Sequence, residues 1–391
     1  MTSPLVSVIC PTFNRSRRIL PTLRSVRNQR FTDWELLVVS DGSTDDTDDV
    51  LAACAREDDR IRPLRTPRHG HPSPVRQAGL ARARGGIVAY LDHDDTWLPD
   101  HLASLVAAVE RGADVVATGA VRVGPDGRVT SVTGPLDLLW HPELQLASPL
   151  FEPSRVAHRA GLSAAVGGWR ALASGLEDWD LWLRLADAGA RFATVDARSA
   201  RLADGGPSRR TRVPRGHQLW LAEFPTAAAA ARAVAGLRAP GAAAELRAAA
   251  RADQLVWYRS LAATGDLRWP EPHQPHGPPA GGDARPASVT ELVERAFAAA
   301  GPGAVPWPEL VVRREPRSDV ATVRVGLPLW CGTAEHTARL RELLWRRQPA
   351  QLALTQRVLG GGPVEGDERK REREGNDRSI PAGGSVALAT R

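Results

Sequence analysis

The first 120 or so residues alternate short apolar runs with segments of helical periodicity, and no other feature of the sequence constrains the fold as strongly. Buried strands are predicted where β-branched and aliphatic residues cluster, at residues 5–10, 34–39, 87–91 and 114–117. The remaining segments predict helices at residues 17–30, 46–56, 75–84 and 100–111, and a Pro-rich loop at residues 63–74. This alternation predicts an α/β fold with a mostly parallel sheet flanked by helices.

The pattern changes after about residue 205, and the chain beyond it is predicted to be mainly helical. A turn at Gly124–Gly127 and an amphipathic helix over residues 176–189 precede that change. The elements predicted after it are two Ala-rich helices within residues 216–262, helices at 287–300 and 334–347, and strand-forming residues at 309–328. We therefore expect a domain over residues 1–215, a helical segment over 216–265, a Pro/Gly linker over 266–286, a C-terminal α+β extension over 287–358 and a disordered charged tail over 359–391.

Composition argues against several classes of function. The 391 residues carry a net charge of +6, and nearly all of the positive charge is Arg because Lys370 is the only lysine. This bias is typical of a GC-rich coding sequence rather than of a nucleic-acid footprint. The 3 cysteines lie too far apart for a metal site, which fits a reducing cytoplasm. No run approaches the roughly 18–20 apolar residues of a membrane span, and no signal peptide is expected. We expect a cytoplasmic protein with no nucleic-acid partner and no transmembrane segment.

Polar residues gather where three of the predicted strands end, in clusters at residues 11–15, 40–45 and 92–95. In open α/β sheets, ligands bind outside the carboxyl ends of the strands. The shared location of the clusters therefore predicts a nucleotide-type site in this half of the chain. The phosphate-binding P-loop, the zinc motif His-Glu-x-x-His and the nucleophile motif Gly-x-Ser-x-Gly are absent. Two further histidines, His69 and His71, are predicted to lie on a loop surface.

The acidic run that begins at Asp92 is the cluster with the clearest chemistry. A divalent ion that bridges a diphosphate needs hard oxygen ligands. Asp92 and Asp94 are two positions apart, so on an extended strand their carboxylates would point the same way. The alternative is that Asp94, Asp95 and Asp100 cap the following helix. The run by itself leaves both interpretations open.

Three other residues of these clusters, and Arg76 on the helix after the Pro-rich loop, suit a nucleotide. Pro11 ends its strand, and Phe13 offers a ring on which a base could pack. Asp41 could accept a hydrogen bond from a base or a ribose hydroxyl, or form an Asx turn. Arg76 could pair with phosphate, or be a solvated arginine.

Two carboxylates, Glu177 and Asp178, begin the predicted helix over residues 176–189. The helix dipole favours negative charge at this end, which is sufficient reason for them to be there. The functional interpretation is that one of them is a general base, which takes a proton in the transition state.

Taken together and in order, these clusters resemble the family-two glycosyltransferases, which have the GT-A fold. The matching stretches are Val6–Arg15, Asp33–Asp45, Ala83–Asp95 and Glu177–Asp180, and the resemblance covers about residues 4–210. It implies an inverting transfer of a sugar from a nucleotide-activated donor, most often UDP-linked, with Mn2+ or Mg2+ as cofactor. The acceptor would be a hydroxyl or other nucleophile of a natural product, a peptide or an envelope glycan.

The resemblance also implies roles for individual residues. Those that would hold the nucleotide are Pro11, Phe13, Asn14, Asp41, Arg76 and Asp92. The metal ligands would be Asp94, as the chief ligand, and Asp92. Asp178 would be the general base, and Glu177 would orient donor or acceptor. Trp179 and Trp182 could stack on sugar faces, although core packing is the better expectation for Trp182.

The chain departs from the family pattern at three places. Many relatives have two acidic residues where this chain has Ser40 and Asp41, and many have Asn where Gln77 stands. Many also carry a His, able to reach the metal, in the loop after the base helix; here Ala203 takes that place, and Asp204 or water could substitute.

Residues beyond about 215 resemble no family. Their tryptophans could frame an acceptor cleft, form a homo-oligomer interface or pack a helical core, and they are Trp220, Trp257, Trp307, Trp330 and Trp345. Two rival functions stay open: a nucleotidyltransferase, which would want a Gly-rich loop that residues 10–18 lack, and a catalytically silent sugar-nucleotide-binding scaffold.

Overall fold

The computed structural model describes residues 3–172, 175–204, 217–272, 288–300, 310–315, 322–329 and 333–362. The chain divides into two compact units. The N-terminal unit consists of residues 1–214, 261–286 and 331–336, and the C-terminal unit of residues 215–260, 287–330 and 337–391.

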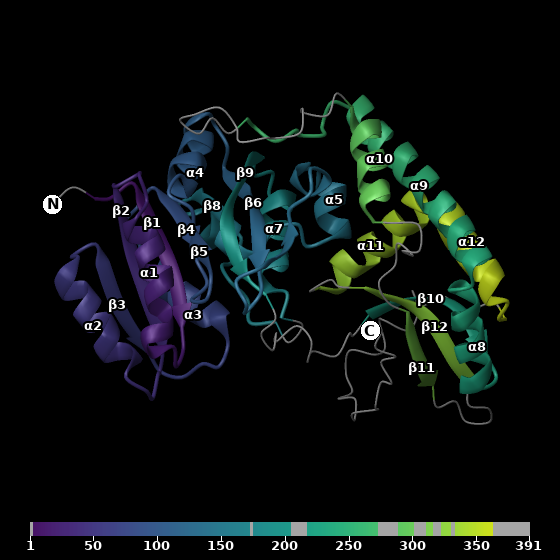
Figure 1. Ribbon diagram of the computed structural model, residues 1–391, viewed down its shortest axis with the longest axis horizontal. Helices are drawn as coiled ribbons and strands as arrows, with labels where there is room; N and C mark the ends of the chain where they lie inside the picture. The colour runs from purple at the N-terminus through teal and green to yellow at the C-terminus, as the bar shows by residue number, and fades with distance from the viewer. Residues whose placement is uncertain are drawn as a thin grey trace. The chain divides into compact units, whose positions relative to one another are not determined.

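A mixed sheet forms the centre of the N-terminal unit (Figure 1). Its first half is parallel, in the order β3-β2-β1-β4, and its strands are β1 (Val6–Thr12), β2 (Trp34–Asp41), β3 (Ile61–Thr66) and β4 (Ile87–Tyr90). Because these strands are parallel, the carboxyl ends of β1, β2 and β4 meet at one edge.

The second half of the sheet is mostly antiparallel, and it contains β5 (Thr96–Trp97), β6 (Val115–Val123), β7 (Val129–Val132), β8 (Val156–Arg159) and β9 (Phe192–Ala203). β8 pairs antiparallel with both β4 and β6, β9 runs parallel to β6, and β5 pairs antiparallel with β9. β7 forms a hairpin with β6 through the predicted turn at Gly124–Gly127.

Helices cover both faces of this sheet. A 3-10 turn at Ser16–Ile19 leads into α1 (Leu20–Arg27), which shares one core with α2 (Thr47–Glu57) and α4 (His101–Glu110). The opposite core contains residues of α7 (Glu177–Asp187) and of α6 (Leu162–Ala165). Shorter helical segments are α5 (Pro142–Ala147) and 3-10 turns at Leu136–Leu138 and Pro153–Arg155. Alternate residues of β1 enter opposite cores, Val8 and Cys10 one and Ile9 the other, as a strand's period of two requires.

One glycine allows α3 (Pro72–Leu80) to pack closely on β1. A Cβ on Gly79 would lie 2.7 Å from Cγ2 of Ile9 and 3.2 Å from Cγ2 of Val39. The start of α3 therefore lies close to the edge where β1 and β2 end, which brings its side chains within reach of the strand-end clusters.

The predicted α/β class is confirmed in the N-terminal unit, with two local corrections. Residues 61–66 form the edge strand β3, although residues 63–74 were predicted to be a loop. Pro63 is tolerated there because an edge strand does not need every N–H. Residues 268 and 271 also make β-bridges to residues 140 and 195, so the start of the predicted linker is held against the sheet.

The C-terminal unit contains a three-stranded antiparallel sheet in the order β10-β12-β11, formed by β10 (His217–Phe224), β11 (Val311–Glu315) and β12 (Thr322–Leu329). Its helices are α8 (Ala227–Leu237), α9 (Pro240–Ala263), α10 (Val289–Ala299), α11 (Ala334–Arg347) and α12 (Pro349–Leu359). α8 and α12 pack on each other and on β10. The prediction of helix at the start of residues 216–262 was wrong, because residues 217–224 form a strand.

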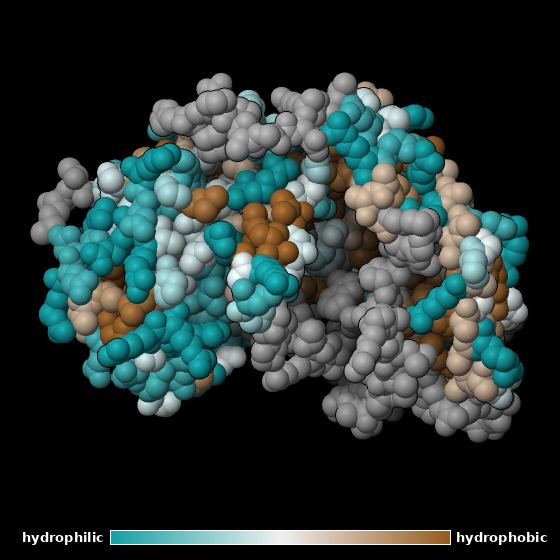
Figure 2. Space-filling view, viewed as in Figure 1, coloured by the Kyte–Doolittle hydropathy of each residue, from teal (hydrophilic) through white to brown (hydrophobic). Residues whose placement is uncertain are grey.

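Among the C-terminal tryptophans, Trp257 is buried and Trp345 is 41% exposed. Trp307, Trp330 and the predicted tail beyond residue 362 lie outside the described residues. Figure 2 shows a mixed, largely hydrophilic surface over the N-terminal unit. Within the described part of the chain, no helix is both long and apolar enough to cross a membrane.

Candidate active site

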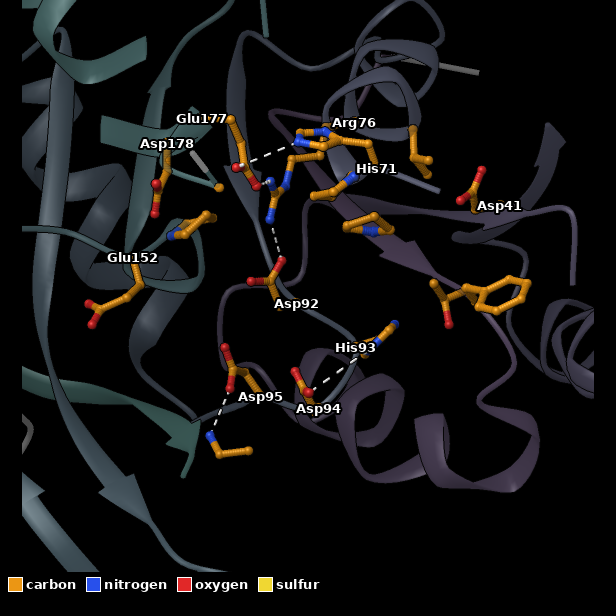
Figure 3. Close-up of a pocket in the computed structure, with 18 of the residues that line it drawn as sticks. Asp41, His71, Arg76, Asp92, His93, Asp94, Asp95, Glu152, Glu177 and Asp178 are labelled. Atoms are coloured by element: carbon orange, nitrogen blue, oxygen red, sulfur yellow. Dashed lines mark hydrogen bonds and ion pairs between the residues drawn. The ribbon is translucent and has the colours of Figure 1, made fainter. Parts of the chain in front are cut away.

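A cavity of about 490 Å3 opens where β1, β2 and β4 end. It brings together nearly all of the residues singled out from the sequence, namely Pro11, Phe13, Asp41, Arg76, Asp92, Asp94, Glu177 and Asp178. In Figure 3, Asp41 lies at one end, Glu177 and Asp178 lie toward the other, and Arg76 and Asp92 lie between them. Asn14 does not line the cavity; its side chain exchanges hydrogen bonds with Thr44, which ties the ends of β1 and β2 together.

At the first end, Asp41 is buried and anchors the loop between β3 and α3. Its carboxylate accepts hydrogen bonds from the backbone N–H groups of His69 at 2.7 Å and Gly70 at 2.9 Å, and it forms an ion pair with Arg68. The guanidinium of Arg68 lies 3.5 Å from the centre of the Phe13 ring. This flat cation therefore covers the ring on which we predicted that a base would pack.

Arg76 connects the acidic run to the start of α7. Its guanidinium lies 2.7 Å from Asp92 and 3.5 Å from Glu177, and only 3% of the residue is exposed. Burial opposes its charge, but the neighbouring carboxylates of Asp92 and Glu177 raise the pKa of Arg76. The alternative of a solvated arginine is wrong, because this side chain is a buried cation held between two carboxylates.

Arg76 packs against a buried network of aromatic and histidine side chains. The guanidinium lies 4.6 Å from the centre of the Trp169 ring. The Trp169 indole N–H donates to the Tyr90 hydroxyl at 3.1 Å, and that hydroxyl lies 2.8 Å from Nε2 of His158. Burial lowers the pKa of His158 to about 4, so this ring is neutral at pH 7. Gln77, which stands where many relatives have Asn, accepts from the backbone N–H of Trp169.

Asp94 is the carboxylate of the acidic run that is most open to the cavity. Its side chain is 45% exposed and forms a 3.2 Å ion pair with Arg15. The Nε–H of Arg15 also donates to Nε2 of His93 at 2.7 Å, and burial lowers the pKa of His93. Asp94 therefore presents carboxylate oxygen to the cavity beside a cation at its rim.

Asp95 also lines the cavity, but it is buried, and its carboxylate connects three segments of the chain. One carboxylate oxygen accepts from the backbone N–H of Ala203 at 2.8 Å, and the other from the Ser154 hydroxyl at 2.5 Å. The same hydroxyl accepts from the backbone N–H of Asp92 at 2.9 Å. Burial, together with the charges of Asp92 and Asp94, raises the pKa of Asp95 well above its ordinary value. The helix-capping alternative is not supported, since Asp100 makes no side-chain capping bond to α4.

The end of β9 lines the cavity, but its side chains there cannot coordinate a metal ion. Ala203 lies at the wall, and Asp204 accepts a hydrogen bond from Thr130 at 2.6 Å. Asp204 is not among the residues that line the cavity, and Gly205 and Gly206 lie outside the described residues. In the described ranges, no group of three or more His, Cys, Asp or Glu side chains is placed to hold a metal by itself.

At the second end, Glu177 and Asp178 begin α7 and are both buried. Nε2 of His71 lies 3.9 Å from Glu177, and its Nδ1 accepts from the backbone N–H of Ser73, which caps α3. The sequence placed His71 on a loop surface, but it lines the cavity. Trp179 and Trp182 are fully buried, with their indole N–H groups bonded to backbone carbonyls, so neither ring faces the cavity.

The cavity is also lined by residues that carried no recognisable signal in the sequence, among them Arg68, Arg122 and Glu152. Arg122 and Glu152 form an ion pair, and the segment that carries Glu152 lies between predicted elements. Only the fold brings Arg122 and Glu152 to this cavity.

Comparisons with known proteins agree with the geometry. Residues 7–166 match the profile of glycosyl transferase family 2. The chain is 37% identical over 139 residues to a putative teichuronic acid biosynthesis glycosyltransferase, TuaG, of Bacillus subtilis, covering 35% of this chain and 53% of the relative. It is 36% identical over 110 residues to a GalNAc(5)-diNAcBac-PP-undecaprenol beta-1,3-glucosyltransferase of Campylobacter jejuni, covering 28% of this chain and 36% of the relative. The chain thus spans about half or less of the length of these relatives.

Two solved structures have a limited likeness to this chain. TarS (residues 1–349) of S. aureus is 22% identical, with a TM-score of 0.44, covering 51% of this chain and 60% of that chain. The mannosyltransferase PcManGT of Pyrobaculum calidifontis is also 22% identical with a TM-score of 0.44, covering 54% of this chain and 60% of that chain. The family profile covers the three strand-end clusters, of which the acidic run is one. Residues 7–166, which carry most of this cavity, are therefore similar to glycosyl transferase family 2.

Proposed function

We propose that this protein transfers a sugar from a nucleoside diphosphate donor, most plausibly a UDP-sugar, to a hydroxyl or other nucleophile of an acceptor. The observation that carries the proposal is the order of groups along one cavity, from Asp41 through Arg76 and Asp92 to Asp178 (Figure 3). A donor that lies along this line has its nucleoside near Asp41 and its diphosphate near the acidic run. Its reacting carbon then lies toward the buried carboxylates of α7.

The nucleoside would be held at the Asp41 end. Pro11 and Phe13 form the wall there, and Arg68 provides a flat, cationic surface over the Phe13 ring. A base can pack on that surface as it would on an aromatic ring. Asn14 acts indirectly in this proposal, because it fixes the ends of β1 and β2 through Thr44.

The diphosphate would be bound with Mn2+ or Mg2+ at Asp94, the chief ligand, and Asp92. The donor set fits such an ion, because Mg2+ is usually held by one or two carboxylates together with substrate phosphates and water. The exposed carboxylate of Asp94 and its neighbour Asp92 meet that requirement without a third protein ligand, which Ala203 does not supply. When bound, the ion would neutralise charge on the departing diphosphate.

The proton of the acceptor would pass to Asp178. This carboxylate lines the cavity at the start of α7, where the helix dipole favours its ionised form. Glu177 stays paired with Arg76, and it would orient donor or acceptor rather than take the proton. A single in-line displacement with one base inverts the anomeric configuration, so an inverting transfer is proposed.

The proposed acceptor class is supported by the names of two relatives, one a putative glycosyltransferase of teichuronic acid biosynthesis and one a glucosyltransferase named for an undecaprenol-linked saccharide. We propose an envelope glycan first, and a natural product or a peptide as alternatives.

The test is to incubate the protein with a panel of sugar nucleotides and Mn2+ and to assay the released nucleotide. We expect nucleoside diphosphate release that EDTA stops, Asp94→Ala abolishes and the exposed control Asp49→Ala leaves unchanged. Asp178→Asn should keep donor binding and lose transfer by ~10²–10⁴-fold, the usual contribution of a general base. Release of pyrophosphate would indicate a nucleotidyltransferase, and tight binding without turnover would indicate a silent scaffold.

A further inference from the structure

A second cavity, of about 280 Å3, adjoins the one described above and shares with it Arg122, Glu152 and Leu202. We call it the side cavity. It lies between the β6–β7 hairpin and the segment at residues 148–155. Resting on the proposed function, we propose that the side cavity binds a neutral sugar unit of the acceptor, next to the unit whose hydroxyl is glycosylated.

The position of the side cavity suits an acceptor rather than a donor. Figure 3 shows Glu152 on the same side of the main cavity as Asp178, and Asp41 on the opposite side. A molecule whose hydroxyl reaches Asp178 can extend past Glu152 into the side cavity without crossing the path of the donor.

A buried arginine, Arg155, is fixed in the wall of the side cavity. Arg155 is 4% exposed, and its Nε–H and one Nη1–H donate to the carbonyl oxygens of Thr118 and Leu150. Nη1 also lies 3.0 Å from Glu152. Nη2 of Arg155 is buried and has no hydrogen-bond partner among the described residues. The bonds of Nε and Nη1 hold the guanidinium in place, so Arg155 contributes a fixed positive charge to the wall of the side cavity.

The charges around the side cavity balance, which favours a neutral ligand. Arg122 and Arg155 face Glu152, and burial opposes the ionised form of Glu152 while these two arginines lower its pKa, so it is charged. Asp137 adds the second negative charge to the wall. Two cations and two carboxylates leave no excess charge for an anion, but they offer donors and acceptors for hydroxyl groups.

The volume of the side cavity, about 280 Å3, suits a small ligand. Sites for drug-sized ligands measure ~300–1,000 Å3, so a cavity just below that range holds one small unit. The rim carries further hydroxyl groups, on Ser131 and Ser148.

The experiment compares Ser131→Trp with Val129→Trp. Both residues lie on β7 and are exposed, but only Ser131 lines the side cavity. Probes are methyl glycosides of neutral hexoses, the matching neutral disaccharides and disaccharides that contain a hexuronic acid. Binding is measured by saturation-transfer difference NMR, and acceptor-stimulated release of nucleoside diphosphate is measured in parallel.

We expect wild type to bind at least one neutral disaccharide about tenfold more tightly than its monosaccharide, equivalent to ~1.4 kcal/mol. Ser131→Trp should remove that preference and leave monosaccharide binding and donor hydrolysis unchanged, whereas Val129→Trp should behave as wild type. The proposal is overturned if disaccharide binding survives in Ser131→Trp, if wild type shows no disaccharide preference, or if the acidic disaccharides bind best. Loss of all donor turnover in wild type would refute the proposed function instead, and the binding data would still decide the side cavity.

Discussion

Replacement of Arg76 by Met should destabilise the N-terminal unit strongly. The methionine keeps the unbranched apolar part of the side chain but removes the cation that lies 2.7 Å from Asp92 and 3.5 Å from Glu177. The side chain of Glu177 is 5% exposed, so its carboxylate would stay buried without its cation, whereas that of Asp92 is 32% exposed and can be solvated. Breaking a buried ion pair costs ~3–5 kcal/mol, and the exposure of Asp92 places our expectation near the lower figure, about 3 kcal/mol.

The assay is urea unfolding at neutral pH, followed by tryptophan fluorescence. Arg30→Met is the matched control, because Arg30 pairs with Asp100 at 2.7 Å with its own side chain 60% exposed, and such surface pairs contribute ~0–1 kcal/mol. In a Glu177→Gln background, Arg76→Met should lower the free energy of unfolding clearly less than in wild type, because the substitution then leaves no ionised carboxylate buried at position 177. If Arg76→Met is as stable as Arg30→Met, or if the two substitutions simply add, the buried ion pair does not act as described.

Two further predictions concern the residues around the acidic run. Asp95→Ala should lower the free energy of unfolding by about 2–4 kcal/mol, because it leaves the Ala203 N–H and the Ser154 hydroxyl without their acceptor. Asp95→Asn should lower it less. Equal urea midpoints for Asp95→Ala and wild type would show that these two hydrogen bonds do not stabilise the fold. The lowered pKa of His158, about 4 against an ordinary 6.5, means that the unfolded chain gains a proton first as the pH falls. The contribution of the neutral, buried His158 to the free energy of unfolding is present above pH ~6.5 and is lost progressively toward pH ~4. The loss is about 2 kcal/mol at pH ~5. Over that window His158→Gln should lose less stability than wild type by this amount, and parallel pH profiles of the two proteins would show that burial of this ring is not what makes it neutral.

The parallel half of the fold was predictable because its strands are buried on both faces. Such strands are continuous apolar runs in the sequence, as in β1 and β2, and the helices between them keep a clear period. β3 was missed because it is an edge strand with alternate exposed residues and a proline, which resembles a loop. The misassigned residues 217–224 form part of a small sheet whose partner strand lies about 100 residues away, so local pattern alone did not reveal it.

The candidate site was predictable where topology determines it. Parallel strands end at the same edge, so polar clusters that follow β1, β2 and β4 must lie together, and the structure brings them into one cavity. The roles within the cluster depend on distant partners. Asp95 and Asp94 are adjacent and chemically identical, yet only Asp95 meets the backbone of Ala203, 108 residues further along the chain. No local sequence pattern distinguishes the buried, hydrogen-bonded Asp95 from the exposed Asp94.

The sharpest measurement for the central claim is the affinity of a nucleoside diphosphate for the protein, by isothermal titration calorimetry with Mn2+ and with EDTA. If the acidic run is a metal-diphosphate site, Mn2+ should tighten binding of UDP or another nucleoside diphosphate to wild type by about tenfold or more, ~1.4 kcal/mol at least. Asp94→Ala should bind with the same weak affinity in both conditions, and Asp49→Ala should follow wild type. Equal metal dependence in Asp94→Ala and wild type, or no metal dependence in either, would contradict the assignment of this run.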